Sequence, residues 1–263
     1  MTRTALVLGV ANKRSIAWAC IESLLEKDFK IVFTYQSDRF AKTAENLISS
    51  KSSTASLVAV SCNVEHEIPE LFDQRLTKIL GESAKIDAVI HSVAYAPPDA
   101  MKDGTLLGTS RESFLKAHDI SSYSFLELAR YATPWMRHGA SLTTLSYLGA
   151  VRAIPNYNVM GPAKASLESL VRGLAIELPD FRVNAISSGP LNTLAARGIN
   201  RFSDIRSEVE ERSPLRKLVT PEDVAKTIRF VATEADGITG QTIYVDGGYS
   251  VVAGPPFLNE MQG

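Results

Sequence analysis

Short apolar segments alternate with amphipathic segments along the whole chain. The apolar segments are β-branched or continuously apolar, which is typical of strands covered on both faces of a sheet. The amphipathic segments place apolar residues at the spacing of a helix. Alternation of this kind predicts parallel strands joined by right-handed crossovers. We therefore expect an α/β protein whose doubly wound parallel sheet has helices on both faces.

The same pattern gives approximate limits for each element. It predicts seven strands, at Thr4–Leu8, Lys30–Tyr35, Leu57–Ser61, Ala88–Ser92, Ala140–Leu145, Arg182–Ser187 and Thr242–Val245. It predicts helices at Ile16–Lys27, Ala41–Ser49, Pro69–Leu80, Ser110–Arg137, Ala163–Leu178 and Pro221–Thr233. No linker rich in Ser, Gly or Pro and no internal repeat divides the sequence, so residues 1–263 are expected to form a single domain.

Two stretches are expected to be neither strand nor plain helix. Ala94–Leu107 contains two prolines and a glycine, and Ser187–Pro214 begins with a Gly-Pro pair and becomes rich in charged residues. Ligands of open parallel sheets bind beyond the carboxyl ends of the strands, where these loops would lie. Long loops in a domain of this kind are usually functional. Both are therefore candidates for a ligand site.

Composition and charge exclude several classes of function. The chain is 45% hydrophobic and 22% charged, as in an ordinary globular protein. Lys and Arg number 28 against 29 Asp and Glu, which gives no indication of nucleic-acid binding. No apolar run approaches the ~18 residues of a membrane span, and the N-terminal segment lacks a cleavage-type signal. We expect a cytoplasmic protein that binds neither nucleic acid nor membrane.

Cysteines and histidines do not indicate a metal site. Cys20 and Cys62 both lie in apolar stretches, and we expect buried thiols. The four histidines do not fall at metal-ligand spacings, and none has an evident partner as a general base. His91, at the end of a predicted strand, is expected to bond a backbone group.

The first strand runs directly into a turn that could hold a phosphate. Gly9 allows the sharp turn, and Ala11 and Ser15 are small enough for a ligand to approach closely. Free N–H groups at the start of the following helix can bind a pyrophosphate, aided by the helix dipole. Only one glycine is present, however, so an ordinary strand–helix turn capped by Ser15 is an alternative.

The end of the second strand bears on the choice of cofactor. A carboxylate in this region usually marks NAD, whereas a nearby Arg tolerates NADP. Here the position is Gln36. A neutral amide can bond ribose hydroxyls, whereas a bare 2′-phosphate would require a facing cation. We expect NADH, and interpret Arg39 and Lys42 as part of a solvated helix face.

Tyr157 and Lys164 have the spacing that most suggests catalysis. They are seven residues apart, almost two turns, so on a regular helix they would share a face. An ammonium beside a phenol favours the phenolate and strengthens the phenol as a donor, which would stabilise an oxyanion in a transition state. Pro162 lies between them and requires that the helix begin close to Met160 or Gly161. The alternative is a chance meeting of a partly buried tyrosine and a surface lysine.

These segments resemble the short-chain dehydrogenase/reductase superfamily and, within it, the bacterial enoyl-acyl-carrier-protein reductases of type II fatty-acid synthesis. Matching segments extend from the loop Gly9–Ala17 to Thr239–Tyr249, near the end of the chain. Most carbonyl-reducing members place the lysine four residues after the tyrosine, but that position is a glycine here. The longer spacing, with Tyr147 ten residues before the second tyrosine, is that of the enoyl reductases.

The resemblance implies a Rossmann-type fold with dinucleotide-binding and catalytic functions in one domain, and a substrate-binding lid at about 190–214. It also implies residue roles. The catalytic residues would be Tyr157, Lys164 and Tyr147. The cofactor would be bound by Gly9, Ser15, Ile16, Gln36, Asn63, Val64, Ser92, Val93, Lys164, Leu191, Asn192, Thr193, Leu194 and Ala195. The substrate would meet Ala96, Tyr147 and Tyr157.

Some positions depart from the family pattern. Asn63 stands where relatives often have Asp, although its amide oxygen can still accept a hydrogen bond from adenine. Ala94 replaces a frequent Gly and adds a methyl group near the cofactor. In the lid, basic residues that relatives place just after Ile199 are absent. Arg201 and Arg206 would take over docking of the acidic carrier protein, unless this segment is simply a solvated helix of mixed charge.

The activity that the resemblance implies is NADH-dependent reduction of a trans-2-enoyl thioester on acyl carrier protein to the saturated thioester. Hydride would add to the β-carbon, and the Tyr157 hydroxyl would bond the oxygen of the resulting enolate. A homotetramer is also implied, in which the apolar segment Tyr249–Pro256 would be buried. A carbonyl or hydroxyl dehydrogenase of the same superfamily, and a catalytically silent dinucleotide-binding sensor, are the alternatives.

Overall fold

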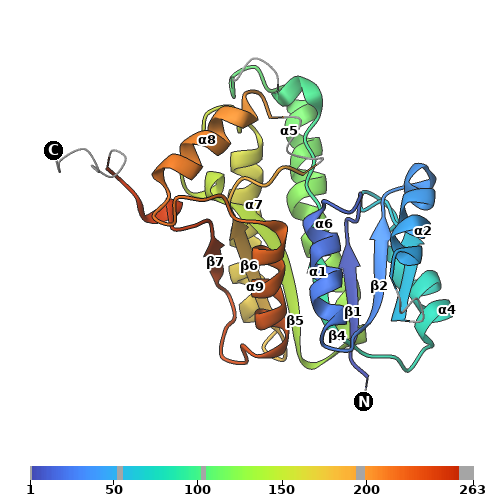
Figure 1. Cartoon of the computed structure of the whole chain (residues 1–263). Coiled ribbons are helices and arrows are strands. Elements are labelled where there is room, and N and C mark those ends of the chain that lie inside the picture. Colours follow the sequence, from blue (N-terminus) through green and yellow to red (C-terminus); the bar gives the residue numbers. More distant parts are fainter. Residues whose placement is uncertain (1, 52–55, 102–104, 194–198, 255–263) are drawn as a thin grey trace.

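Seven parallel strands form the centre of the protein (Figure 1). The computed structural model describes residues 2–51, 56–101, 105–193 and 199–254. The strand order is β3-β2-β1-β4-β5-β6-β7. The strands are β1 (Thr4–Leu8), β2 (Lys30–Tyr35), β3 (Leu57–Ser61), β4 (Ile86–His91), β5 (Met136–Tyr147), β6 (Arg182–Ser188) and β7 (Thr242–Val245). The predicted α/β fold with a doubly wound parallel sheet is confirmed.

Helices cover both faces of this sheet. They are α1 (Ile16–Leu25), α2 (Ala41–Ser49), α3 (Ile68–Glu70), α4 (Thr77–Leu80), α5 (Arg111–His118), α6 (Ser124–Ala132), α7 (Met160–Glu177), α8 (Phe202–Arg212) and α9 (Pro221–Thr233). Two π-helical turns, η3 (Leu71–Leu76) and η5 (Asp119–Tyr123), join α3 to α4 and α5 to α6. Short 3-10 turns are η1 (Asp38–Phe40), η4 (Pro98–Met101), η6 (Thr133–Trp135), η7 (Leu148–Ala150) and η9 (Tyr249–Val251).

Alternate residues of β1 divide the core into two layers. Ala5 and Val7 belong to an apolar cluster with side chains of α1, α2 and α9. Leu6 and Leu8 belong to a second cluster with side chains of η3, α6 and α7. Helices α1 and α9 lie side by side on one face (Figure 1). Because successive strand side chains point to opposite faces, burial on both faces requires a continuously apolar strand, as the sequence pattern indicated.

The predicted helix over Ser110–Arg137 is wrong at its end and in its middle. Strand β5 already begins at Met136, which pairs with Ile86 of β4. Pro134 lies in η6 between α6 and that strand, and a proline cannot continue the hydrogen bonding of a helix. The π turn η5 divides the rest of the predicted helix into α5 and α6. Hydrophobic spacing alone cannot register one extra residue in a turn.

Helix α8 lies in a stretch that was expected to be neither strand nor plain helix, although a solvated helix of mixed charge was the alternative for its charged part. Its apolar residues are few, and only Val209 is buried. Polar interactions supplement this contact, since Arg212 donates to Glu208 one turn earlier at 3.0 Å. The sequence pattern therefore contained too weak an apolar stripe to predict the helix.

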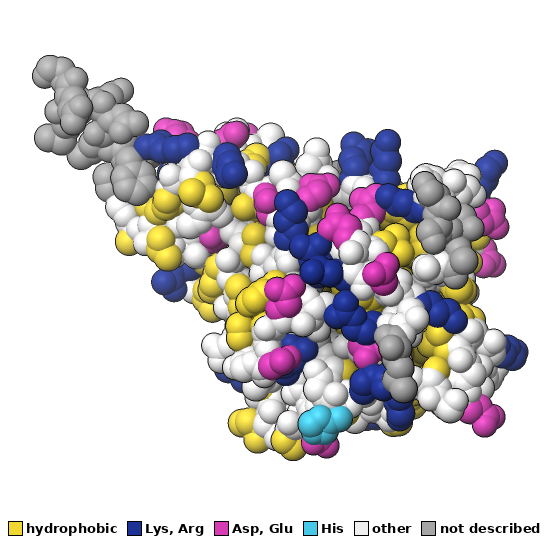
Figure 2. Space-filling model, turned by 60° about the horizontal axis from the view of Figure 1, so that its bottom comes forward, with side chains coloured by type: hydrophobic (Ala, Val, Ile, Leu, Met, Phe, Trp, Pro, Cys, Tyr) yellow, Lys and Arg dark blue, Asp and Glu magenta, His cyan; other side chains and the backbone are white. Residues whose placement is uncertain are grey.

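Charges of both signs are interspersed on the face of the molecule that lies below the sheet (Figure 2). Several are paired near the amino ends of the strands, including Arg137 with Asp87 at 2.7 Å and Arg229 with Glu26 at 2.5 Å. Such exposed pairs each contribute little to stability. In the ranges that the structure describes, no helix is long and apolar enough to cross a membrane.

Candidate active site

The loops that follow β1 and β4 meet at the point where the strand order reverses. Gly9 follows β1 directly and has φ +94°, a conformation that L side chains rarely adopt. A Cβ at this position would overlap the carbonyl oxygen of Ser92, which follows β4. The Ser92 N–H in turn donates to Leu8 at 3.1 Å. Glycine is therefore required here by close backbone approach, at the usual ligand site of such sheets.

Ser15 caps the helix that follows this turn. Its hydroxyl accepts from the Trp18 N–H at 3.3 Å and donates to the Asn12 carbonyl at 2.7 Å. Ile16 is the first residue of α1. The cap predicted as an alternative is thus present, and it also orients the amino end of α1, where N–H groups and the helix dipole favour an anion.

Gln36, Asn63 and Val64 lie at one edge of the sheet. Gln36 follows β2, and Asn63 and Val64 follow β3, whose Ser61 is paired with Tyr35 of β2. Gln36 is exposed. The Asn63 side-chain oxygen accepts from the Glu65 N–H at 3.2 Å. A carbonyl oxygen has two lone pairs, so this oxygen can still accept from a ligand. The predicted adenosine residues are therefore brought together.

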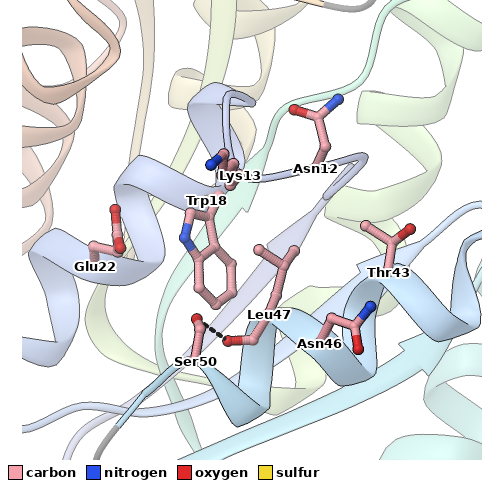
Figure 3. A pocket seen from close by; sticks show the side chains of 8 residues that line it. All are labelled: Asn12, Lys13, Trp18, Glu22, Thr43, Asn46, Leu47 and Ser50. Carbon is pink, nitrogen blue, oxygen red and sulfur yellow. Dashed lines mark hydrogen bonds between the residues drawn. The ribbon is translucent and has the colours of Figure 1, made fainter.

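A hollow of about 520 Å³ lies beside this region, between α1 and α2 (Figure 3). Its floor includes the Trp18 ring, and Lys13 of the first turn lies at its rim. The side chains that line it are Asn12, Lys13, Trp18, Glu22, Thr43, Asn46, Leu47 and Ser50. The sequence did not indicate this hollow.

Tyr147 and Tyr157 lie against each other at the carboxyl end of β5. Their ring centroids are 4.8 Å apart and their planes are inclined by 70°. Tyr147 ends β5, and Tyr157 lies in the turn before α7. A Cβ at Gly149 would overlap the Tyr157 ring, so this glycine makes room for it. The sequence brings two phenols, ten residues apart, into one cluster.

The turn that holds Tyr157 has an unusual backbone. Asn156 and Asn158 on either side of it have φ +64° and +40°, a region that asparagine tolerates better than most residues. The Asn158 side chain donates to the Ala100 carbonyl of η4 at 3.1 Å. Tyr157 is therefore not on a regular helix with Lys164, as the spacing had suggested. Helix α7 begins at Met160, which places Pro162 in its first turn as required.

Lys164 is buried in α7, with 4% of its surface exposed. Its ammonium donates to the Leu145 carbonyl of β5 at 2.7 Å, and an ammonium has three donors. Burial lowers the pKa of Lys164 to about 8, while the nearby carboxylate of Glu168 acts to raise it. The alternative of a surface lysine is thus excluded.

Both tyrosines are neutral phenols. Burial raises the pKa of Tyr157, and the neighbouring Tyr147 raises it further. Burial is also the main reason for the raised pKa of Tyr147, followed by Tyr249 and Glu208. The effect of an ammonium that the sequence suggested is not among the causes of the Tyr157 shift, and burial favours the neutral form. A neutral phenol is the form that donates a hydrogen bond.

The Tyr147 hydroxyl is a buried polar atom with no hydrogen-bond partner among the described residues. Such groups are rare, and each requires an explanation. Around it lies an apolar cluster in which Ala94, Ala96 and Tyr147 pack against buried Tyr157 and Met160. Ile199, just beyond the undescribed residues 194–198, packs against the same cluster. The arrangement fits a ligand with an apolar chain and a polar atom near both phenols.

The remaining predicted cofactor residues that the structure describes follow β4 and β6, at the carboxyl-terminal edge of the sheet. Val93 is near Gly9, where an added Cβ would lie 3.1 Å from its side chain. Leu191 is buried among the residues of the α1 and α9 layer, and the Thr193 N–H donates to its carbonyl at 2.8 Å. Asn192 lies between them and is exposed. Leu194 and Ala195 lie outside the described residues.

Other titratable groups have no place at a metal centre. Among the described residues no group of His, Cys, Asp and Glu could hold a metal ion. Cys20 and Cys62 are buried free thiols, as predicted, and burial raises the pKa of Cys62 to about 12. The ring nitrogens of His91 bond the hydroxyls of Thr144 at 3.0 Å and Ser124 at 2.9 Å. The expected partner of this ring was a backbone group.

Sequence reasoning missed several buried polar residues behind the site. Ser146 donates to Glu168 at 2.6 Å. In η5, the Ser121 hydroxyl accepts from the Tyr95 N–H at 2.9 Å and donates to its carbonyl at 2.8 Å. These residues lie in otherwise apolar periodic segments. A polar residue at an apolar position of such a segment was the signal that could have identified them, because a buried polar group requires a partner.

Comparisons with known proteins indicate the family of this chain. The family model "Enoyl-(Acyl carrier protein) reductase" matches residues 9–250. The NADH enoyl-[acyl-carrier-protein] reductase of Bacillus subtilis is 40% identical over 254 residues, covering 95% of this chain and 97% of that protein. The NADPH enoyl-[acyl-carrier-protein] reductase of Staphylococcus aureus is 41% identical, with coverage of 95% and 97%. The crystal structure of the enoyl-(acyl-carrier-protein) reductase of Anaplasma phagocytophilum with NAD has a TM-score of 0.89 at 36% identity, covering 97% of this chain and 96% of that one.

Proposed function

The chain belongs to the enoyl-acyl-carrier-protein reductase family, and on that premise we propose that Tyr157, Lys164 and Tyr147 form its catalytic centre. It is an oxidoreductase of fatty-acid synthesis that reduces enoyl thioesters. The observation that carries the assignment of the centre is the contact between the two neutral phenols. Lys164 is buried in the helix that follows them.

Tyr157 donates a hydrogen bond to the thioester carbonyl oxygen of the substrate. When hydride adds to the β-carbon, negative charge develops on that oxygen, and a fixed donor in a buried site stabilises it more than water would. Because Tyr157 retains its proton, the substrate leaves this step as an enolate that is hydrogen-bonded to the phenol. The α-carbon is then protonated, ultimately from solvent.

Tyr147 places the substrate. Its unpartnered hydroxyl lies next to Tyr157, and an incoming polar atom would satisfy it. The apolar cluster that includes Ala96 and Met160 receives the first carbons of the acyl chain. A thioester that enters in this orientation presents its oxygen to the phenols and its chain to the apolar wall.

The residues around Gly9 fit a dinucleotide, which supplies the hydride when it is bound. Gly9, Ser15 and Ile16 hold its diphosphate at the amino end of α1. Gln36, Asn63 and Val64 bind the adenosine end. Ser92, Val93 and Leu191–Ala195 border the nicotinamide end, and Lys164 donates to the adjacent ribose. The observation that supports a dinucleotide here is Gly9. Because it has no side chain, the loops after β1 and β4 stay in contact and the turn leaves room for a ligand.

NADH is the preferred cofactor in this proposal. Gln36 is neutral and exposed at the end of β2, so a 2′-phosphate on the adenine ribose would lack a cation at that position. Gln36→Arg should therefore improve the use of NADPH relative to NADH. Initial rates with both cofactors on one enoyl thioester test this. A higher kcat/KM of the natural protein for NADPH would contradict it and implicate Arg39 and Lys42.

The segment at about 190–214 acts as a lid over the cofactor and the acyl chain. Ile199 packs on the tyrosine cluster, and α8 forms the later part of this segment. Arg201 and Arg206 meet the acidic carrier protein. Arg201 is paired with Asp204 at 2.6 Å, so Arg206 is the stronger candidate. Arg206→Glu should raise KM for an enoyl-carrier protein and leave crotonyl-coenzyme A kinetics unchanged. Equal effects on both substrates would assign it to the lid instead.

A homotetramer is part of the same proposal. Apolar side chains are exposed on α5, η5 and α7, including Leu115, Tyr123 and Ile176. Exposed apolar patches of this kind are typical of association surfaces. Val251, in the segment Tyr249–Pro256, is exposed as well, and residues from 255 lie outside the described ranges. Light scattering at micromolar concentration should give the mass of four chains, and a monomeric mass would refute the assembly.

The activity is tested by mixing purified protein with NADH and crotonyl-coenzyme A and following the loss of nicotinamide absorbance. We expect steady turnover that depends on the enoyl thioester and is absent with a simple ketone. Turnover of the ketone alone would indicate a carbonyl reductase. Binding of NADH without turnover of either substrate would indicate a sensor.

A further inference from the structure

Two buried charged residues of α7 bind adjacent positions of β5. Lys164 and Glu168 are four residues apart and therefore share a face of the helix. Lys164 donates to the carbonyl of Leu145 at 2.7 Å, and Glu168 accepts from the hydroxyl of Ser146 at 2.6 Å. Tyr147 is the next residue of β5. The two contacts thus join α7 to β5 immediately before the catalytic tyrosine.

Glu168 has no part in the reaction described above, yet it is costly to bury. Only 4% of its surface is exposed, and burial raises its pKa, while the bond from Ser146 lowers it. Two cations of the same helix, Arg172 and Lys164, also favour its charged form. Tyr244 of β7 faces it as a neutral phenol, whose pKa is raised by burial and by this carboxylate. Burying a carboxylate costs free energy, so its place among groups that favour its charged form requires a structural or functional explanation.

The groups that face Lys164 leave it with one source of negative charge in the described structure. His91 of β4 is neutral, because burial lowers its pKa to about 3. Neither Tyr157 nor Tyr147 adds a charge, because both are neutral phenols. Glu168 is the charged group that acts to raise the pKa of Lys164. Without it, burial alone would determine whether the lysine is charged.

We propose that Glu168 is a positioning residue that keeps Lys164 charged and, with Ser146, fixes the contact between α7 and β5 that directs the ammonium to its ligand. The inference rests on the proposed role of Lys164 toward the cofactor ribose. An uncharged amine would still donate, but more weakly, since hydrogen bonds from charged donors are about twice as strong. Glu168 therefore sets the upper pH at which the cofactor is held.

The direct test is the titration of the Lys164 amine in the full-length protein. Protein labelled with ¹⁵N-lysine is titrated by NMR, and the Lys164 signal is identified by its absence from Lys164→Arg. In Glu168→Gln the midpoint should move to lower pH. Glu177→Gln is the matched control, because it removes an exposed carboxylate at the end of the same helix. An unchanged midpoint in Glu168→Gln would overturn the proposal.

NADH binding by fluorescence gives the second readout. For Glu168→Gln, the Kd should match the natural protein at about pH 6.5 and be about threefold weaker or more at about pH 9. Ser146→Ala keeps the charge and loses one bond, so a smaller change in the same direction is expected, and this variant serves if Glu168→Gln does not fold. Equal weakening at both pH values would indicate a merely structural role. If Lys164→Ala binds NADH normally, the proposed role of Lys164 fails, whereas the amine titration still decides the effect of Glu168.

Discussion

Gly9 and Gly81 show how one type of residue can serve two purposes. Both have positive φ, at +94° and +87°. An added Cβ at Gly9 would overlap Ser92, whereas at Gly81 it would meet nothing within 4 Å. Backbone strain is thus common to both positions, and close approach is particular to Gly9. This pair separates the conformational need for glycine from the need for space.

Gly9→Ala should therefore be more damaging than Gly81→Ala. Each replacement places an L side chain at a positive φ that such residues rarely adopt, at a cost of about 1–3 kcal/mol. Only Gly9→Ala should also force the loops after β1 and β4 apart and weaken NADH binding. Urea unfolding and NADH fluorescence measure the two effects. Equal stability losses, with NADH binding intact in both variants, would contradict the close-approach argument.

At the scale of single residues, the sequence predicted chemistry better than conformation. Tyr147, Tyr157 and Lys164 were identified by spacing and resemblance, and the structure brings both tyrosines into contact. The shared helix face that the spacing suggested for Tyr157 and Lys164 is not formed, because α7 begins at Met160 and Asn156 and Asn158 adopt left-handed conformations. Such conformations depend on tertiary contacts, here the bond from Asn158 to Ala100. Hydrophobic spacing contains no information about them.

The π turn η5 joins several parts of the site. Ser121 makes two hydrogen bonds to the backbone of Tyr95, in the loop after β4. Ser122 donates at 2.9 Å to Ser166 of α7, which lies two residues after Lys164. Ser124, the first residue of α6, bonds His91 of β4. The three serine side chains are buried. Single π turns inside helices are frequent at functional sites, and this one fixes three neighbouring elements.

Ser121→Ala should loosen the loop that borders the acyl chain. Two hydrogen bonds are lost, each contributing about 1 kcal/mol, and Ala96 lies next to the freed backbone. We expect a higher KM for crotonyl-coenzyme A, by roughly tenfold, with a smaller change in the Kd of NADH. Ser122→Ala is the control, since it loses a bond to α7 and leaves the loop tethered. If both variants raise KM equally, η5 acts on the whole fold rather than on this loop.

The elements themselves were predictable where burial decides them. Strands β1, β2, β3 and β7 and helices α2 and α9 have the predicted limits. The failures are the junction of α6 with β5 and the break at η5, and α8 was predicted only as an alternative. In α8 a single buried residue, Val209, gives almost no apolar period. At the start of β5, Met136 continues the apolar spacing of the preceding helix although it pairs with β4. Propensity is overruled there by strand pairing.

The stability of the whole molecule should depend on pH through His91. Its folded pKa is about 3, below its ordinary value of 6.5, because burial disfavours the charged ring. As pH falls below about 6.5 the unfolded chain takes up a proton at His91 and the folded chain does not, so stability decreases until about pH 3. The slope from this residue is at most about 1.4 kcal/mol per pH unit.

His91→Gln isolates this contribution, because glutamine does not titrate and can still donate and accept. Urea unfolding between about pH 6.5 and pH 4 should show a smaller loss of stability in the variant than in the natural protein. Carboxylates whose folded pKa is lowered, such as Glu67 and Asp223, also lose stabilising interactions as the pH falls. They act equally in both proteins. Parallel curves would show that His91 is not held neutral.

The central claim is that Tyr157 supplies the hydrogen bond that stabilises the enolate. The most direct measurement is single-turnover reduction of crotonyl-coenzyme A by NADH in Tyr157→Phe, beside Tyr147→Phe, with the Kd of NADH determined for both. Loss of one oxyanion donor predicts a rate for Tyr157→Phe that is lower by roughly 10²–10³ at unchanged NADH binding. Tyr147→Phe should mainly raise KM. A Tyr157→Phe protein with nearly full turnover, and a Tyr147→Phe protein without it, would reverse the two roles.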